Sequence, residues 1–264
     1  MNTIEKNIIE LNKLQSLQQR SHWMNKLHPL GKLLISIIYI IDVVSFDKYD
    51  IVTLLVMSVY LIFGFVVGEL SLKEGIYRMR LILPLLIFTG IFNPFFDRQI
   101  IFSLPLAGGK LTLPITSGII SMLTLMIKGL FTILATYILI ALTSIEDICY
   151  ALRMLHIPKT IVIVIMLIYR YLGVMAEEAD RMTTAYKLRA PSQKGLNIKV
   201  WGTFVGQWLL RSMDKAGIVY ESMLLRGFKG DFITSKRNIK GTDIAFFAIW
   251  LMIITAIRFG GFFR

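Results

Sequence analysis

The stretch "GIISMLTLMIKGLFTILATYILIAL", residues 118–142, decides the fold class of this chain. Lys128 is its only charged residue. A helix needs roughly 17 to 25 predominantly apolar residues to cross the hydrocarbon core of a bilayer, which is about 30 Å thick. The stretch therefore predicts a transmembrane helix.

Four further apolar runs approach the same length, at residues 30–46, 51–67, 81–96 and 243–260. The whole chain is 55% hydrophobic and 17% charged, whereas soluble domains are roughly a quarter charged. These runs predict an all-α membrane protein with about five transmembrane helices. A sixth run, 161–175, is shorter and leads directly into "AEEADRM", which favours the apolar start of a long amphipathic helix over a further span.

The positive charges predict the orientation, because Lys and Arg are enriched in cytoplasmic loops. With the N-terminus inside, 23 of the 29 Lys and Arg residues are cytoplasmic, and fifteen of them lie in 146–242. The net charge of +12 then needs no nucleic-acid partner. The predicted organisation is a cytoplasmic N-terminal segment, four transmembrane helices, a cytoplasmic domain and a C-terminal transmembrane helix, at residues 1–29, 30–142, 143–242 and 243–264.

The cytoplasmic domain carries its own helix boundaries. A short helix is expected at 145–156, after Thr143 or Ser144 and before Pro158. A second helix should run from Pro158 until Pro191, and a third from just after Gly195 to Gly227. The domain is therefore predicted to hold one short and two long helices.

Each long helix ends in a similar tripeptide. These are Leu188-Arg189-Ala190 and Leu225-Arg226-Gly227. One interpretation is capping, because a cation in the last turn interacts favourably with the helix dipole. The other is docking, in which a guanidinium with small neighbours enters an acidic groove on a partner. The duplication favours docking on a two-fold partner.

Four glycines and one lysine are further candidates. Gly64 with Gly68, and Gly202 with Gly206, have the spacing that permits close helix crossing, although this spacing is also common by chance. Lys128 would face the bundle interior or a pathway if its span is placed correctly. It could equally snorkel or mark a misplaced boundary.

Metal and nucleotide sites are not expected in this chain. His22, His28 and His156 are scattered, and the lone Cys149 is expected to be a small buried residue. The Gly-Gly-Lys in "PLAGGKLTL" lacks the other residues of a phosphate-binding loop.

Four segments together resemble the transmembrane T component of energy-coupling factor (ECF) transporters, most closely the cobalt type, CbiQ. They are "HPLGKLL" (28–34), "TSIEDICYALRMLHIPK" (143–159), "YRYLGVMAEEADRMTTAYKLRA" (169–190) and "RSMDKAGIVYESMLLRGF" (211–228). The resemblance covers the chain from about residue 20. It implies a subunit of an importer in the plasma membrane of a prokaryote, in which the cytoplasmic domain is a coupling domain.

In that family the T component joins two cytoplasmic ATPases to a membrane S component that binds the substrate. The resemblance implies that Arg189 engages one ATPase and Arg226 the other. Catalysis, ATP and Mg would then belong to the ATPases and the metal to the S component, so that this chain is no enzyme and binds no cofactor. Nickel or a vitamin would use the same type of subunit. Here Leu replaces the usual leading Ala in both motifs, and Ala190-Pro191 replaces a Gly in the first.

Two rival classes remain at this stage. A stand-alone secondary carrier would use Lys128 as its functional charge, and Pro84, Gly90 and Pro94 do interrupt the third predicted span. The halves of the chain show no convincing repeat, however. An intramembrane enzyme would need a Ser/His, paired-Asp or metal constellation within the spans, and the sequence shows none.

Overall fold

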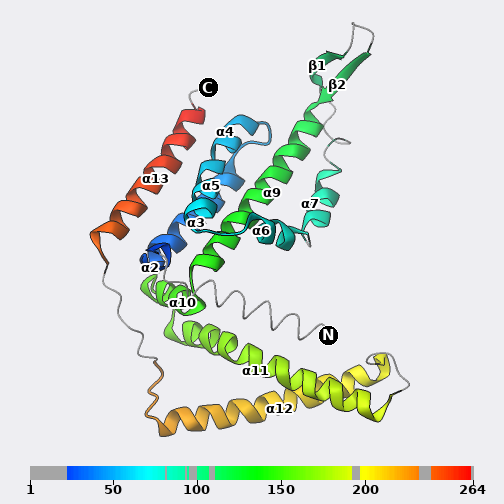
Figure 1. The fold of residues 1–264 in the computed structure, drawn as a ribbon, viewed down its shortest axis with the longest axis vertical. Coiled ribbons are helices and arrows are strands. Elements are labelled where there is room, and N and C mark those ends of the chain that lie inside the picture. Colours follow the sequence, from blue (N-terminus) through cyan, green and yellow to red (C-terminus); the bar gives the residue numbers. More distant parts are fainter. Residues whose placement is uncertain are drawn as a thin grey trace. The chain divides into compact units, whose positions relative to one another are not determined.

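The computed structural model describes residues 23–80, 82–92, 94, 100–106, 111–191, 197–231 and 239–262, and Figure 1 shows its ribbon. These residues form two compact units. The unit at 23–144 and 239–262 is named the membrane unit and the unit at 145–231 the coupling unit, after the domains that the sequence predicts. Most of the predicted N-terminal segment, 1–22, lies outside the described residues.

The membrane unit is helical with one two-stranded hairpin. Its elements in chain order are α2 (Trp23–Lys26), α3 (Pro29–Ser45), α4 (Ile51–Val56), α5 (Ser58–Val67), α6 (Leu72–Met79), α7 (Leu83–Gly90), β1 (Ile100–Leu106), β2 (Leu111–Thr116), α9 (Ser117–Leu142) and α13 (Gly241–Phe262). The coupling unit holds α10 (Ile145–Met154), α11 (Lys159–Arg189) and α12 (Ile198–Leu225).

The fold class is confirmed as an all-α membrane protein. Among the described residues, three helices are long and apolar enough to cross a membrane, namely those at Ser117–Leu142, Lys159–Arg189 and Gly241–Gly260. The span predicted at 30–46 corresponds to α3, which has 17 residues. The number of five spans and the position of 161–175 outside the bilayer stay predictions.

Two predicted spans show irregular helix in the described residues. The run 51–67 is an apolar helix, Ile51–Val67, with a turn at Met57 that separates α4 from α5. The buried Tyr39 hydroxyl donates to the Met57 carbonyl at 3.1 Å, which satisfies a backbone group at the break. Of the run 81–96, the structure describes helix α7 from Leu83 to Gly90, while several of the residues beyond it lie outside the described ranges.

The β-hairpin was not predicted. Strands β1 and β2 pair antiparallel, with Leu106 opposite Leu111, and the register shifts between Ile100 and Phe102. The apolar runs "IIFSLPL" and "LTLPIT" flank a Gly-Gly pair, a pattern typical of a hairpin. The fold is therefore helical with a small addition between α7 and α9.

The core of the membrane unit lies around α3, which Figure 1 shows between α13 and α9. Tyr39 is fully buried, and its ring lies 4.5 Å from that of Tyr60 between centroids. Tyr60 in turn contacts Trp250 of α13 at 5.1 Å. The Tyr60 hydroxyl lies 3.1 Å from that of Ser36, so the hydroxyls of both buried tyrosines are hydrogen-bonded.

The ends of α3, α9 and α13 are joined to one another. Lys32 of α3 is buried and donates its Nζ to the Leu142 carbonyl, the last residue of α9, at 2.9 Å. Asp243 in the first turn of α13 accepts from the His28 amide, at the start of α3, at 3.1 Å. Charged side chains thus satisfy backbone groups that a helix end leaves unpaired.

The three helices predicted for the coupling domain are confirmed. The expected ranges 145–156 and 158–190 match α10 and α11 closely. Helix α12 begins at Ile198, where the Asn197 side chain accepts from the Lys199 amide at 3.2 Å. This residue type is favoured at a helix N-cap.

Candidate functional site

The two long helices of the coupling unit cross each other. The Trp208 indole of α12 donates to the Met175 carbonyl of α11 at 3.3 Å. One turn further along each helix, Arg211 forms an ion pair with Glu178. Glu178 also lies 4.0 Å from Arg181, which pairs with Glu177 at 3.9 Å. A hydrogen bond and a group of exposed charges therefore mark the crossing point.

The end of α12 at Arg226 has a Schellman geometry. The Phe228 amide donates to the Met223 carbonyl at 3.0 Å, and the Gly227 amide donates to the Leu224 carbonyl at 2.9 Å. Gly227 has φ +81°, a left-handed conformation that glycine adopts without steric cost. This turn ends the helix with Arg226 and Gly227 exposed to solvent.

Phe228 turns back toward the helices. Together with Met223 it lines an apolar groove of about 420 Å³ between α11 and α12. Ile163 and Leu167, from the first half of α11, line the same groove. A hydrophobic residue after a Schellman turn commonly packs against the last turn of its helix, and here it also reaches the neighbouring helix.

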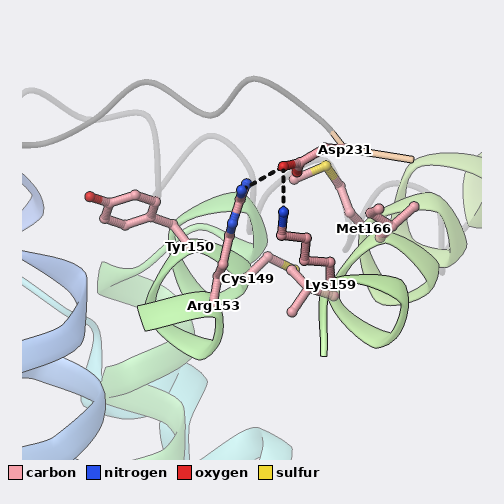
Figure 2. A pocket seen from close by; sticks show the side chains of 8 residues that line it. Cys149, Tyr150, Arg153, Lys159, Met166 and Asp231 are labelled. Atoms are coloured by element: carbon pink, nitrogen blue, oxygen red, sulfur yellow. Dashed lines mark hydrogen bonds and ion pairs between the residues drawn. The ribbon is translucent and has the colours of Figure 1, made fainter. Parts of the chain in front are cut away.

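Asp231, which follows in the same segment, forms ion pairs with two helices. Its Oδ2 lies 2.6 Å from Arg153 Nη2 of α10 and 3.5 Å from Lys159 Nζ of α11, as Figure 2 shows. Loss of water around the Asp231 carboxyl raises its pKa, but the hydrogen bond and charge of Arg153 and the proximity of Lys159 outweigh this effect. The pKa of Asp231 therefore lies below its ordinary value, and the carboxylate is charged at neutral pH.

The end of α11 at Arg189 is built differently. The Ala190 amide donates to the Tyr186 carbonyl at 3.0 Å, with Ala190 at φ −132°, and Pro191 follows. Leu188 is 78% exposed, and its counterpart Leu225 is 90% exposed. Among the described residues, no hydrogen bond or ion pair engages the guanidinium of Arg189 or of Arg226. Both arginines are exposed.

The two arginines lie at opposite ends of the helix pair. Lys159 is the first residue of α11 and Arg189 the last, about 45 Å apart at 1.5 Å per residue. Asp231 contacts Lys159 and is only five residues beyond Arg226. Helix α12 therefore brings Arg226 back to the end of α11 remote from Arg189, in agreement with the crossed ribbons of Figure 1.

Lys128 lies in the membrane unit, away from both motifs in the chain. Its Nζ donates to the carbonyls of Val44, at 3.2 Å, and Phe46. These carbonyls belong to the last turn and the C-cap of α3, which have no partner within the helix. The amine therefore closes the C-terminal end of a neighbouring helix.

The two glycine pairs differ. A Cβ on Gly64 would come 2.8 Å from Ile138 Cδ1, so that α5 and α9 approach closely there, and a Cβ on Gly68 would come 3.3 Å from Leu142 Cδ2. A Cβ on Gly202 or Gly206 would meet nothing within 4 Å in the described part of the chain. Gly64 and Gly68 thus lie at a helix contact, while the other pair faces open space.

Cys149 lies beside the Asp231 cluster, as Figure 2 shows. It is fully buried, and burial together with the nearby Glu146 raises the pKa of its thiol. The thiol is therefore protonated and inert at neutral pH. In the described ranges, no group of three or more His, Cys, Asp and Glu residues has a geometry that could hold a metal ion.

The sequence singled out the two arginine tripeptides but assigned no role to the residues that surround the second one. Arg153, Lys159 and Phe228 lie within the segments that resemble the family, whereas Asp231 lies outside them. The only local signal was the pair of glycines in "RGFKGD", residues 226–231, which indicates a turn.

Helices that are long and apolar enough to cross a membrane define the class of this chain as an all-α membrane protein. The model of the cobalt transport protein family, CbiQ, matches residues 20–239. The chain therefore belongs to the CbiQ family of cobalt transport proteins, as the resemblance of its motifs indicated. No curated protein matches it.

Proposed function

We propose that this chain is the T subunit of an ECF-type importer that links two cytoplasmic ATPases to a substrate-binding S component in the membrane, for the uptake of cobalt. The observation that carries the proposal is the pair of exposed Leu-Arg motifs at opposite ends of one crossed helix pair. Membership of a cobalt transport family supports a transport role and this cargo.

The docking chemistry follows from the exposed side chains. Leu188 and Leu225 expose most of their apolar surface beside a guanidinium. Arginine is enriched among the residues that contribute most to binding, and its planar fork pairs well with carboxylates. Each motif therefore fits an acidic groove with an apolar rim. Two such motifs, separated by most of a helix length, suit two separate ATPase subunits.

The helix pair can act as crossed levers. From the crossing point, Arg189 is 14 residues beyond Met175 and Arg226 is 18 residues beyond Trp208, which corresponds to arms of about 21 and 27 Å. A movement of the two ATPases toward or away from each other would therefore change the crossing angle. ATP and Mg act in the ATPases, and this chain binds neither.

The S component would contact the apolar faces of the long helices. Exposed apolar residues follow a helical spacing along both helices: Ile161, Val164, Ile168 and Leu172 on α11, and Trp201, Val205, Leu209 and Met213 on α12. Exposed apolar surface of this extent marks protein or membrane contact. Tilting these faces would tilt the S component and release the metal inward.

The proposed location is the plasma membrane of a prokaryote, with the N-terminus and the coupling unit in the cytoplasm. The distribution of Lys and Arg supports this orientation. The contacts of Lys128 favour a subunit over a stand-alone carrier, because its amine is bonded to the carbonyls at the end of α3 rather than directed at a substrate path.

Charge reversal tests the proposal. Arg189→Glu and Arg226→Glu, singly and together, are expressed with the ATPases and the S component, and the bound ATPase is quantified after purification. Each reversal should cost about 2–5 kcal/mol, as expected when one partner of a desolvated charge pair is lost. The double variant should retain the S component and lose the ATPases.

The matched controls are Lys187→Glu and Lys229→Glu, which reverse an exposed charge two or three residues from each arginine. Both should retain the ATPases. An intact complex in the double arginine variant would sink the docking assignment. Metal specificity is tested separately, by uptake of radioactive cobalt in competition with nickel.

A further inference from the structure

The segment that follows α12 doubles back on the coupling unit. Gly227 at φ +81° and Gly230 at φ +76° both adopt left-handed backbone conformations. Phe228, between them, lines the apolar groove, and Asp231 follows the second glycine. The two glycines thus turn the chain so that Phe228 lines the groove between α11 and α12, while Asp231 contacts α10 and α11.

Asp231 meets a well-defined corner between α10 and α11. The Ile157 amide donates to the Leu152 carbonyl at 3.3 Å, with His156 at φ +62°, which is a Schellman turn closed by a non-glycine residue. Pro158 then starts α11. Arg153 precedes this corner and Lys159 follows it, so both cations are held on a rigid turn.

A single oxygen of Asp231 bridges the two cations. Oδ2 lies 2.6 Å from Arg153 and 3.5 Å from Lys159, and Figure 2 shows both contacts meeting at Asp231. The carboxylate thus lies between two positive side chains, one on each side of the corner. It forms an ion pair with each of them, and opposite charges at these distances attract.

We infer that Asp231 is a positioning residue for the docking motif at Arg226. By holding Arg153 and Lys159, it fixes the segment 227–231, and with it the exposed Arg226, against the start of α11. The docking part of this inference rests on the proposed function. Movement of an ATPase bound at Arg226 would then be transmitted to the corner of α10 and α11 as well as along α12.

Spin labels measure the positioning directly. Lys229→Cys carries a nitroxide between Phe228 and Asp231, and Lys187→Cys carries one beside Arg189; the native Cys149 is buried. In the purified full-length chain, Asp231→Asn should raise the mobile fraction at position 229 roughly three- to tenfold, the range for loss of a charge-assisted contact to two partners. The label at position 187 should not change.

Three variants separate positioning from a general structural effect. Asp231→Glu keeps the charge and should restore most of the immobile signal. Arg153→Asp combined with Asp231→Arg reverses the stronger pair and should recover more immobile signal than either change alone. Asp214→Asn, an exposed carboxylate on α12, is the matched control and should leave the spectrum unchanged.

The complex with the ATPases provides the second readout. Asp231→Asn should speed ATPase dissociation roughly three- to tenfold in a background of Arg189→Glu, in which Arg226 is the remaining dock. An unchanged spectrum at position 229 would overturn the clamp. A mobile label without faster dissociation would overturn its positioning role. Failure of the proposed function would be detected independently, because the complex would then retain the ATPases when both arginines are reversed.

Discussion

The two arginine motifs end similar helices but are supported differently. At Arg226 a left-handed glycine, a phenylalanine in the apolar groove and a bridged aspartate hold the helix end within six residues. At Arg189 the described residues show a helix that ends in Ala190 and Pro191, with a backbone hydrogen bond from the Ala190 amide. Within the described part of the chain, two similar tripeptides therefore have different helix-end geometries.

This difference indicates that the proposed docking motif and the structure that holds it in place are separate properties. The tripeptide supplies the guanidinium and the apolar neighbour, whereas residues elsewhere determine how firmly the tripeptide is held. The proposed coupling mechanism needs both, because force from an ATPase passes through the anchored segment. The anchored end should respond to substitutions that leave the other end unaffected.

The largest effect on this contrast is expected from Gly227→Val. A β-branched residue at φ +81° is strained, at a cost of about 2 kcal/mol. Opening of the last turn should then increase, and hydrogen exchange at the Phe228 amide should accelerate roughly thirtyfold.

Gly217 provides the control for this change, because it lies within α12 and a Cβ there meets nothing within 4 Å. Gly217→Ala should stabilise the helix by about 0.5–1 kcal/mol. Exchange at Phe228 that stays within threefold in Gly227→Val would show that the left-handed turn does not hold this helix end.

A smaller effect is expected from Phe228→Ala. Removal of a half-buried ring from the groove should cost about 1–2 kcal/mol and raise the mobility of a label at position 229. Leu225→Ala removes a side chain that is 90% exposed, so it should weaken ATPase binding without loosening the segment. Equal mobility in the two variants would remove Phe228 from the anchor.

The smallest effect is the pH dependence of the anchor. The pKa of Asp231 is lowered in the folded chain, so its contribution is fully present above the ordinary aspartate pKa of about 3.9 and is lost as pH falls through the lower folded value. The label at position 229 should therefore be immobile from pH 8 to pH 5 and gain mobility only below about pH 4. A transition near pH 6 would contradict control by Asp231.

Local signals in the sequence predicted much of the coupling unit. Three helix boundaries are marked by a backbone property of the residue itself, at Pro158, Pro191 and Gly227. Helix α11 begins after the first of these residues and ends before the second, and α12 ends before the third. The membrane unit was predicted less completely. No proline or glycine marks the break at Met57, and the hydroxyl that donates to its carbonyl comes from Tyr39, 18 positions away.

The anchor of Arg226 was beyond local reasoning. Asp231 pairs with Arg153 across 78 positions, and the residues around each give no sign of the other. Lys128 shows the same limit. The sequence indicated that Lys128 is an unusual charge in a span, but its partners at the end of α3 lie more than 80 positions away. Contacts of this kind follow from the fold and cannot be inferred from spacing.

Photo-crosslinking tests the central claim most directly. A photoreactive phenylalanine replaces Leu188, Leu225 or both, the strongly exposed leucines of the motifs, in the assembled complex. The account predicts that each single position crosslinks one ATPase subunit, and that the double variant yields a product with two ATPase subunits on one chain. Crosslinks from both positions to the S component or lipid alone, or a double variant that never exceeds one ATPase, would contradict it.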